Sequence, residues 1–154
     1  DQFVSSGYSD QGSTGEPLQS NTHRIQEGQP IGNFWGYKVI DIDENGHWII
    51  EGADGNSKPI AELQPTDKQV IGNGLPKHYL NWNNSLRWKG FDFNLTMRGA
   101  FAFDILNMPR LQYGAPVMLA RGNVLNEAFD NKFGKTPLAV DQELQYVSYY
   151  TILR

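Results

Sequence analysis

The sequence predicts an all-β protein built from antiparallel strands. Aromatic residues make up 12% of its 154 residues although the chain is polar overall, a combination that suits strands better than disorder. Glycine and proline, 16 and 8 residues respectively, recur along the chain and disfavour long helices. Residues 91–101 alternate between apolar and polar side chains with the period of a β-strand.

Composition excludes several classes of function. Lysine and arginine number 13 against 17 aspartate and glutamate residues, and the net charge of −4 argues against nucleic-acid binding through phosphate neutralisation. The absence of cysteine removes disulfides, thiolate metal sites and cysteine nucleophiles. No run of about 18 apolar residues is present, so no transmembrane helix is expected. The three histidines, His23, His47 and His78, are too far apart in the sequence to suggest a zinc site.

The first part of the chain is expected to be mostly loop, with one hairpin. Residues 1–29 are polar and lack periodicity, so we interpret them as irregular. Strand-forming runs flank Asn45-Gly46, and Asn-Gly between two such runs is a strong hairpin signal because both central residues of that turn need positive φ. The sequence therefore predicts a hairpin over 33–50, followed by a loop over 52–67.

The most informative segment is 79–103, which follows a glycine-rich bend at 70–76. In the second half of this segment, apolar side chains share one face and polar side chains share the other. The apolar set is Phe91, Phe93, Leu95, Met97 and Phe101, and the polar set is Asp92, Asn94, Thr96 and Arg98. Only Lys89-Gly90 separates this run from the preceding one, so the two runs predict a tight antiparallel hairpin.

The first arm of that hairpin, Tyr79 to Trp88, alternates less regularly, because Asn84 shares a face with Leu80, Trp82, Leu86 and Trp88. Each arm is about ten residues long, the length of a strand that crosses a bilayer at a tilt. Aromatic residues gather near both ends, as they do at membrane interfaces. A soluble β-sheet hairpin with one face in a core explains the same alternation and is the commoner structure. The pattern alone therefore leaves both readings open.

The last part of the chain returns to loop and then to strand. Glycines and prolines interrupt residues 104–144, where we expect a loop with a short helix at 124–129. Residues 145–154 form another β-rich run that ends before any turn. Because the chain also begins at Asp1 without an initiator methionine, we expect a piece of a larger protein.

Asp41 to Glu51 nearly match the calcium-loop pattern D-x-[DN]-x-[DN]-G-x5-E, in which oxygen ligands at alternate positions suit a hard cation. The last acidic residue stands one position early, however, and the flanking residues predict strands where this motif needs helices. A polar hairpin turn explains the same residues more simply. No metal or other cofactor is expected, and calcium binding stays an alternative.

Nothing in the sequence points to an enzyme. Acidic pairs such as Asp41 with Asp43, or Glu127 with Asp130, are present. Glycosidase chemistry requires a fixed distance between two carboxylates, and nothing in the sequence fixes that distance for these pairs. His78 has no nucleophile motif beside it, and no serine lies in a G-x-S-x-G elbow. No catalytic residue is therefore predicted.

An alternative function is sugar binding. Sugars stack on aromatic rings, while amides and carboxylates bind their hydroxyl groups. Trp35, Tyr37 and Trp48 lie on or near the predicted 33–50 hairpin among asparagine and aspartate residues. The alternative prediction is therefore a soluble all-β carbohydrate-binding module. Taken one at a time, however, each of these aromatic residues is better explained as part of a hydrophobic core or of an aromatic girdle.

Several strings, in order across residues 27–107, resemble one family. EGQPIGNFWGYK occupies 27–38 and DKQVIGNGLPK occupies 67–77. The hairpin carries NNSLRWKGFDF at 83–93, followed by RGAFAFDILN at 98–107. This ordered set is similar to the SusC/RagA-type TonB-dependent outer-membrane transporters, and the chain resembles the C-terminal part of their barrel.

The resemblance implies an antiparallel segment of a large transmembrane β-barrel of about 22 strands with long extracellular loops. It implies import of oligosaccharides or peptides, energised by TonB-ExbB-ExbD, with a SusD-like surface lipoprotein as partner. The implied location is the outer membrane of a Gram-negative, Bacteroidetes-like cell. In this family the plug domain and the TonB-contacting segment lie N-terminal to the barrel, and we expect neither within these residues. The resemblance assigns no substrate-binding residue.

Barrel topology then orients the hairpin. Outer-membrane barrels have short periplasmic turns and long extracellular loops, so Lys89-Gly90 is expected on the periplasmic side. The expected order is an extracellular excursion over 1–78, a spanning hairpin over 79–103, an extracellular loop over 104–144 and the start of the next strand over 145–154. We expect lipid to contact Phe91, Phe93, Leu95, Met97 and Phe101, and the lumen to be lined by Asp92, Asn94, Thr96 and Arg98.

Overall fold

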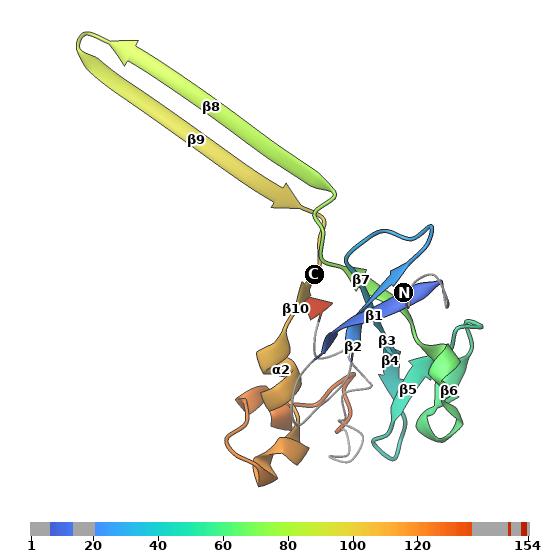
Figure 1. Ribbon diagram of the computed structural model, residues 1–154. Helices are drawn as coiled ribbons and strands as arrows, with labels where there is room; N and C mark the ends of the chain where they lie inside the picture. Colours follow the sequence, from blue (N-terminus) through green and yellow to red (C-terminus); the bar gives the residue numbers. More distant parts are fainter. Residues whose placement is uncertain (1–6, 14–20, 137–147, 149–151, 154) are drawn as a thin grey trace.

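A computed structural model describes residues 7–13, 21–136, 148 and 152–153 of the chain. A body of short strands and helices carries one long hairpin, formed by strands β8 and β9, which projects away from it (Figure 1). The body contains chain from before and from after the hairpin, so the two parts meet again at the base of the hairpin (Figure 1). Among the described residues, no helix has the length and apolar character needed to span a membrane.

Four strands form the first sheet of the body, in the order β1-β2-β3-β7. They are β1 Tyr8–Ser13, β2 Asn21–Gln26, β3 Asn33–Gly36 and β7 Gln69–Asn73, and neighbouring strands run antiparallel. The prediction that residues 1–29 are irregular is therefore wrong for β1 and β2. The predicted bend at 70–76 likewise begins as strand β7.

A polar pair, rather than apolar alternation, holds β1 against β2. Arg24 lies directly opposite Asp10 and donates two hydrogen bonds to its carboxylate, at 2.6 and 2.9 Å. The same guanidinium stacks between the rings of Tyr8 and Trp35, 3.9 and 4.1 Å from their centroids. These two strands lack the alternation of apolar and polar residues from which strands are predicted, so the sequence did not indicate them.

Three strands form the second sheet, in the order β4-β5-β6. They are β4 Lys38–Ile42, β5 Trp48–Glu51 and β6 Ser57–Pro59. The predicted hairpin over 33–50 is wrong in its first part, because β3 pairs with β2 and β7 while β4 and β5 alone form the hairpin. The chain leaves the first sheet at Tyr37, whose side chain is buried in the core. The predicted 52–67 loop contains β6 and the 3-10 helices η1 Ile60–Glu62 and η2 Pro65–Asp67.

The turn between β4 and β5 differs from the expected two-residue form. Gly46 has a φ of 89°, whereas Asn45 does not adopt a positive φ. The Asp43 N–H donates to His47 O at 2.8 Å and the Gly46 N–H donates to Asp43 O at 3.2 Å, which gives a longer loop with a glycine bulge. Asp43 Oδ1 accepts the N–H groups of Asn45 and His47, both at 2.8 Å, and these bonds favour the longer turn.

The core of the body draws on both sheets and on helix α2. Its buried side chains are Phe34, Tyr37, Ile42, Trp48, Ile50, Ile71 and Leu111. Trp48 is 0% exposed and Tyr37 is 6% exposed, so neither can form the sugar-binding surface that was the alternative prediction. The Trp35 ring is stacked against the Arg24 guanidinium and belongs to the packing of the first sheet.

The chain after the hairpin is not the plain loop expected over 104–144. It contains β10 Ile105–Leu106, α2 Met108–Tyr113 and the 3-10 helices η3 Pro116–Ala120 and η4 Asn126–Phe129. Helix α2 begins where the Asn107 side chain accepts the Arg110 N–H at 3.0 Å, and Pro109 suits its first turn. The short helix predicted at 124–129 corresponds to η4. Residues 137–144 lie outside the described residues.

Strand β11, Ile152–Leu153, pairs antiparallel with β10. The chain runs through β10 away from the hairpin, so β11 runs back toward it (Figure 1). The return strand expected over 145–154 stays a prediction. Apart from Ser148 and β11, that range lies outside the described residues.

Candidate functional site

Strands β8 (His78–Trp88) and β9 (Phe91–Phe101) form an uninterrupted two-stranded ladder. All 11 residues of each strand pair in register, without a bulge. The turn between them has two residues, Lys89 with a φ of 44° and Gly90 with a φ of 87°. Positive φ at both central positions is the type I′ geometry, whose twist matches that of the flanking strands. The hairpin predicted from the Lys89-Gly90 spacing is confirmed.

One face of this hairpin is apolar along most of its length. Directly opposite residues of an antiparallel pair project to the same side, so the register brings the apolar sets of the two strands together. The pairs on this face are His78 with Phe101, Leu80 with Gly99, Trp82 with Met97, Asn84 with Leu95, Leu86 with Phe93 and Trp88 with Phe91. Asn84, as the sequence indicated, and His78 at the open end are its polar residues.

Gly99 is the other interruption of the apolar face, and Phe101 covers it. A Cβ on Gly99 would lie 2.6 Å from atoms of the Phe101 ring, which means that the ring occupies the space a side chain would take. An aromatic ring over a strand glycine restores apolar cover where the glycine leaves a gap. On β9, apolar side chains therefore cover this face as far as Phe101 at the open end of the hairpin.

The body does not cover the apolar face. Every residue of β8 and β9 except Gly99 is exposed, and Phe91 and Leu86 expose 75% and 61% of their surface. Soluble monomers rarely leave a contiguous apolar surface of this extent open to water. The face therefore needs an apolar environment that the described residues do not supply.

The opposite face of the hairpin is polar. Its pairs are Asn81 with Arg98, Asn83 with Thr96, Ser85 with Asn94 and Arg87 with Asp92, with Tyr79 and Ala100 at the open end. Arg87 Nε donates to Asp92 Oδ1 at 2.5 Å, so these two charges neutralise each other beside the turn. The residues predicted to face lipid and those predicted to face the lumen thus occupy opposite faces of one hairpin. What each face contacts stays a prediction.

The hairpin has the dimensions of a membrane crossing. A strand of 11 residues rises about 36 Å at about 3.3 Å per residue, and a tilt of about 45° reduces its height to roughly 25 Å. That height equals the apolar band of outer-membrane barrels. On the apolar face, Trp88 and Phe91 stand at the turn, and Trp82 and Phe101 stand toward the open end, as expected for two interfacial girdles.

Both long edges of the hairpin lack a partner strand among the described residues. The unpaired N–H and C=O groups of such an edge are unstable in lipid, and in water they invite pairing with another chain. A membrane location for this hairpin would therefore require a further strand at each edge.

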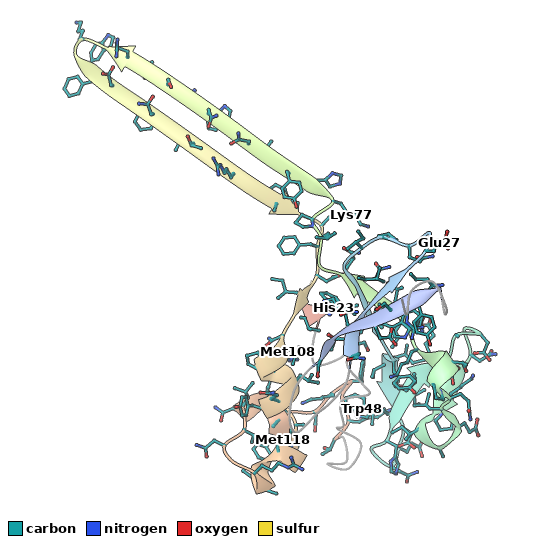
Figure 2. All side chains as sticks on the ribbon, in the orientation of Figure 1. His23, Glu27, Trp48, Lys77, Met108 and Met118 are labelled. Carbon is teal, nitrogen blue, oxygen red and sulfur yellow. The ribbon has the colours of Figure 1, made fainter. Side chains whose placement is uncertain are left out.

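The body lies at the open end of the hairpin, away from the Lys89-Gly90 turn (Figure 2). Residues that precede the hairpin in the sequence contact residues that follow it there. Leu111, from after it, packs in the core with Trp48, from before it. Lys135 Nζ donates to the Ile42 carbonyl oxygen and also lies near the Asp41 carboxylate. The two predicted extracellular segments, where described, form one unit.

The other candidate sites from the sequence have structural roles. Asp43 accepts backbone N–H groups in its turn, chiefly that of His47, and these bonds lower the pKa of its carboxyl group. Asp41 lies 3.4 Å from Lys135 and Glu127 lies 3.0 Å from Arg110. His78 is exposed at the base of the hairpin. Within the described parts of the chain, no three or more His, Asp or Glu side chains gather where they could hold a metal ion.

Sequence reasoning missed three residues that matter for the architecture. Leu111 carries the core into the segment after the hairpin, and Asn73 and Asp104 join the body to the hairpin base. Asn73 lies in Gly72-Asn73-Gly74, within the glycine-rich bend expected at 70–76. None of the three belongs to an alternating run, so periodicity could not reveal them.

Comparison with known proteins identifies a similar sequence. An alignment 124 residues long, which covers 73% of the chain, shows 30% identity to TonB-dependent receptor P3 of Formosa agariphila. The chain spans only 12% of the length of that relative. No protein-family model matches the sequence, and no solved structure matches it. The chain is thus related to a TonB-dependent receptor.

Proposed function

We propose that this chain forms part of the wall and the extracellular loops of a TonB-dependent transporter in the outer membrane. The observation that carries the proposal is the β8–β9 hairpin, a regular ladder with one largely apolar, exposed face and one polar face. The relationship to a TonB-dependent receptor supports the same assignment. No catalytic step is part of this proposal.

In the proposed orientation, the hairpin crosses the membrane with its turn in the periplasm. Short turns belong on that side of outer-membrane barrels, and Lys89-Gly90 is a two-residue turn. The body then lies outside the cell. The apolar face, with Phe91, Phe93, Leu95, Met97 and Phe101, contacts lipid, and the polar face, with Asp92, Asn94, Thr96 and Arg98, lines the lumen.

A closer assignment rests on the sequence strings at 27–38, 67–77, 83–93 and 98–107. We propose that the protein belongs to the SusC/RagA type, in a barrel of about 22 strands. The proposed substrates are oligosaccharides or peptides, and the proposed partners are a SusD-like surface lipoprotein and the TonB-ExbB-ExbD complex. The proposed location is the outer membrane of a Gram-negative, Bacteroidetes-like cell.

The soluble sugar-binding module is the weaker candidate. The structure buries Tyr37 and Trp48, which that function needs at the surface. It also leaves a long apolar face open, which a soluble module would have to cover.

An immunoblot of fractionated source cells tests the proposal. An antibody against the body is applied to inner-membrane, outer-membrane and soluble fractions, each run with and without boiling. We expect an outer-membrane band much larger than the 17.4 kDa of this chain, with a mobility that shifts on boiling because a closed barrel resists unfolding in detergent. A soluble band near 17.4 kDa would overturn the assignment.

A further inference from the structure

The hairpin joins the body through a narrow neck of two chain segments, one entering β8 after Asn73 and one leaving β9 toward β10 (Figure 1). The side chains of the hairpin do not pack against the body, since nearly all of them are exposed. An open groove of about 990 Å³ lies beside the neck, between the body and the hairpin base. The angle between body and hairpin therefore depends on the hydrogen bonds of the neck itself.

Asn73 stands at the centre of those hydrogen bonds. Its backbone N–H donates to Asp104 Oδ2 at 2.9 Å, and its carbonyl oxygen accepts the Asp104 N–H at 2.8 Å. Its side-chain Nδ2 donates to Asn33 Oδ1 at 2.7 Å and to the Ile31 carbonyl oxygen at 3.1 Å. Its Oδ1 accepts the Leu75 N–H at 2.7 Å. One residue thus binds the start of β3, the entry to the hairpin and the exit from it.

Backbone contacts extend this junction on both sides. The Gly74 N–H donates to Gly32 O at 3.0 Å, and the Lys77 N–H donates to Phe101 O at 3.1 Å. Gly32 has a φ of +86°, and a Cβ there would lie 2.9 Å from Leu75 Cγ, so this close approach requires glycine. The entering segment is therefore held against the body as well as against the exit segment.

We propose that Asn73 and Asp104 are positioning residues that clamp the body to the hairpin at a fixed angle. The reciprocal Asn73–Asp104 pair joins the entry and exit segments, and the Asn73 side chain ties that pair to the body. Bending at the neck would have to break several of these bonds together. This inference goes beyond the proposed transport function, because it concerns how the outer body is held, whatever passes beneath it.

Distances between spin labels test the clamp in the full-length protein that carries this chain, purified from membranes with any native cysteines replaced by serine. These 154 residues contain no cysteine, so labels can be placed at will. One pair of cysteines, at Glu62 and Ser85, spans the neck. A second pair, at Glu62 and Arg121, lies within the body and reports whether the body stays folded. All three positions are exposed.

We expect a narrow Glu62–Ser85 distance distribution in the parent protein. Asn73→Ala should widen that distribution roughly twofold, because local segments reorient when their fixing contacts are lost, and should leave the Glu62–Arg121 distribution unchanged. Asp104→Asn keeps an acceptor oxygen and should behave like the parent. Asn126→Ala, at an exposed asparagine of the body, is the matched control and should change neither distribution.

Two results would overturn the clamp. One is an unchanged Glu62–Ser85 distribution in Asn73→Ala. The other is equal widening of both distributions, which would make Asn73 a general stability residue of the body. The heat-shift immunoblot tests the transporter assignment separately, so failure of either proposal is recognised without the other.

Discussion

Lys58 Nζ lies 2.7 Å from the buried carboxylate of Asp67 and ties β6 to η2. The Gln64 N–H donates to the second carboxylate oxygen at 2.9 Å. The hydrogen bond from Lys58, followed by that from Gln64, lowers the pKa of Asp67 below its ordinary value of 3.8. The hydrogen bond to Asp67 in turn raises the pKa of Lys58 above its ordinary value of 10.5. The folded body therefore prefers both groups charged.

This pair predicts acid sensitivity. The stabilisation by Asp67 is fully present above its ordinary pKa of 3.8 and is lost as the pH falls through the lower pKa of the folded state. Asp67→Asn should lower the stability of the body at neutral pH and flatten its loss of stability in acid. Hydrogen exchange of the body as a function of pH measures both effects. Glu62→Gln, at an exposed position, serves as the control, and an identical acid profile for both variants would contradict the prediction.

The two faces of the hairpin predict opposite responses to one charge. Leu95→Arg should lower the unfolding free energy by roughly 2–4 kcal/mol if the site lies at mid-membrane, because a charge on the lipid face is costly there. Asn94→Arg, one residue away on the polar face, should be tolerated. Urea unfolding of the full-length protein in lipid vesicles compares the two. Equal tolerance at both positions would disprove the assigned faces.

The shared core predicts that a residue after the hairpin supports the chain before it. Leu111→Ala removes a side chain that is 4% exposed, and it should destabilise the body by about 2–5 kcal/mol. Faster hydrogen exchange should extend to β3, β4 and β5, which precede the hairpin. Leu119→Ala, at a side chain 57% exposed, should change stability by no more than about 0.5 kcal/mol. Faster exchange confined to α2 would refute a common core.

The type I′ turn predicts a specific need for glycine at position 90. Gly90 has a φ of +87° with open space around it, so Gly90→Ala should cost roughly 1–2 kcal/mol through backbone strain alone. Gly122→Ala is the matched control, because Gly122 also has open space but no positive φ. Urea unfolding in vesicles measures the difference. A cost at Gly122 as large as that at Gly90 would count against the turn geometry.

The hairpin could be predicted from the sequence because its information is local. Strict alternation from Phe91 to Met97 sets the faces, and a two-residue gap at Lys89-Gly90 sets the register of the opposite arm. Each signal lies within a few residues of the structure it determines. Gly99 interrupts the pattern in the sequence, but the Phe101 ring covers the gap.

The body could not be predicted in the same way, because its interactions join distant residues. Strands β1 and β2 are joined by the ion pair between Arg24 and Asp10, which the pattern of apolar and polar residues cannot reveal. The 33–50 prediction failed because β3 pairs with β2 and β7, and the chain leaves that sheet at the buried Tyr37 before β4 begins. The clamp at Asn73 depends on Asp104, from the far side of the hairpin.

The shared core of the body sets the order in which the molecule can be assembled. Trp48 and Phe34 are synthesised before the hairpin, but Leu111 follows it, so the core cannot close until the whole hairpin has been made and has turned back. Contacts between such distant residues form slowly, because a long loop must close first. Until then Trp48 lacks one of its core neighbours. A truncation just after Phe101 removes Leu111 from the core, and we expect its product to aggregate more readily than the whole chain.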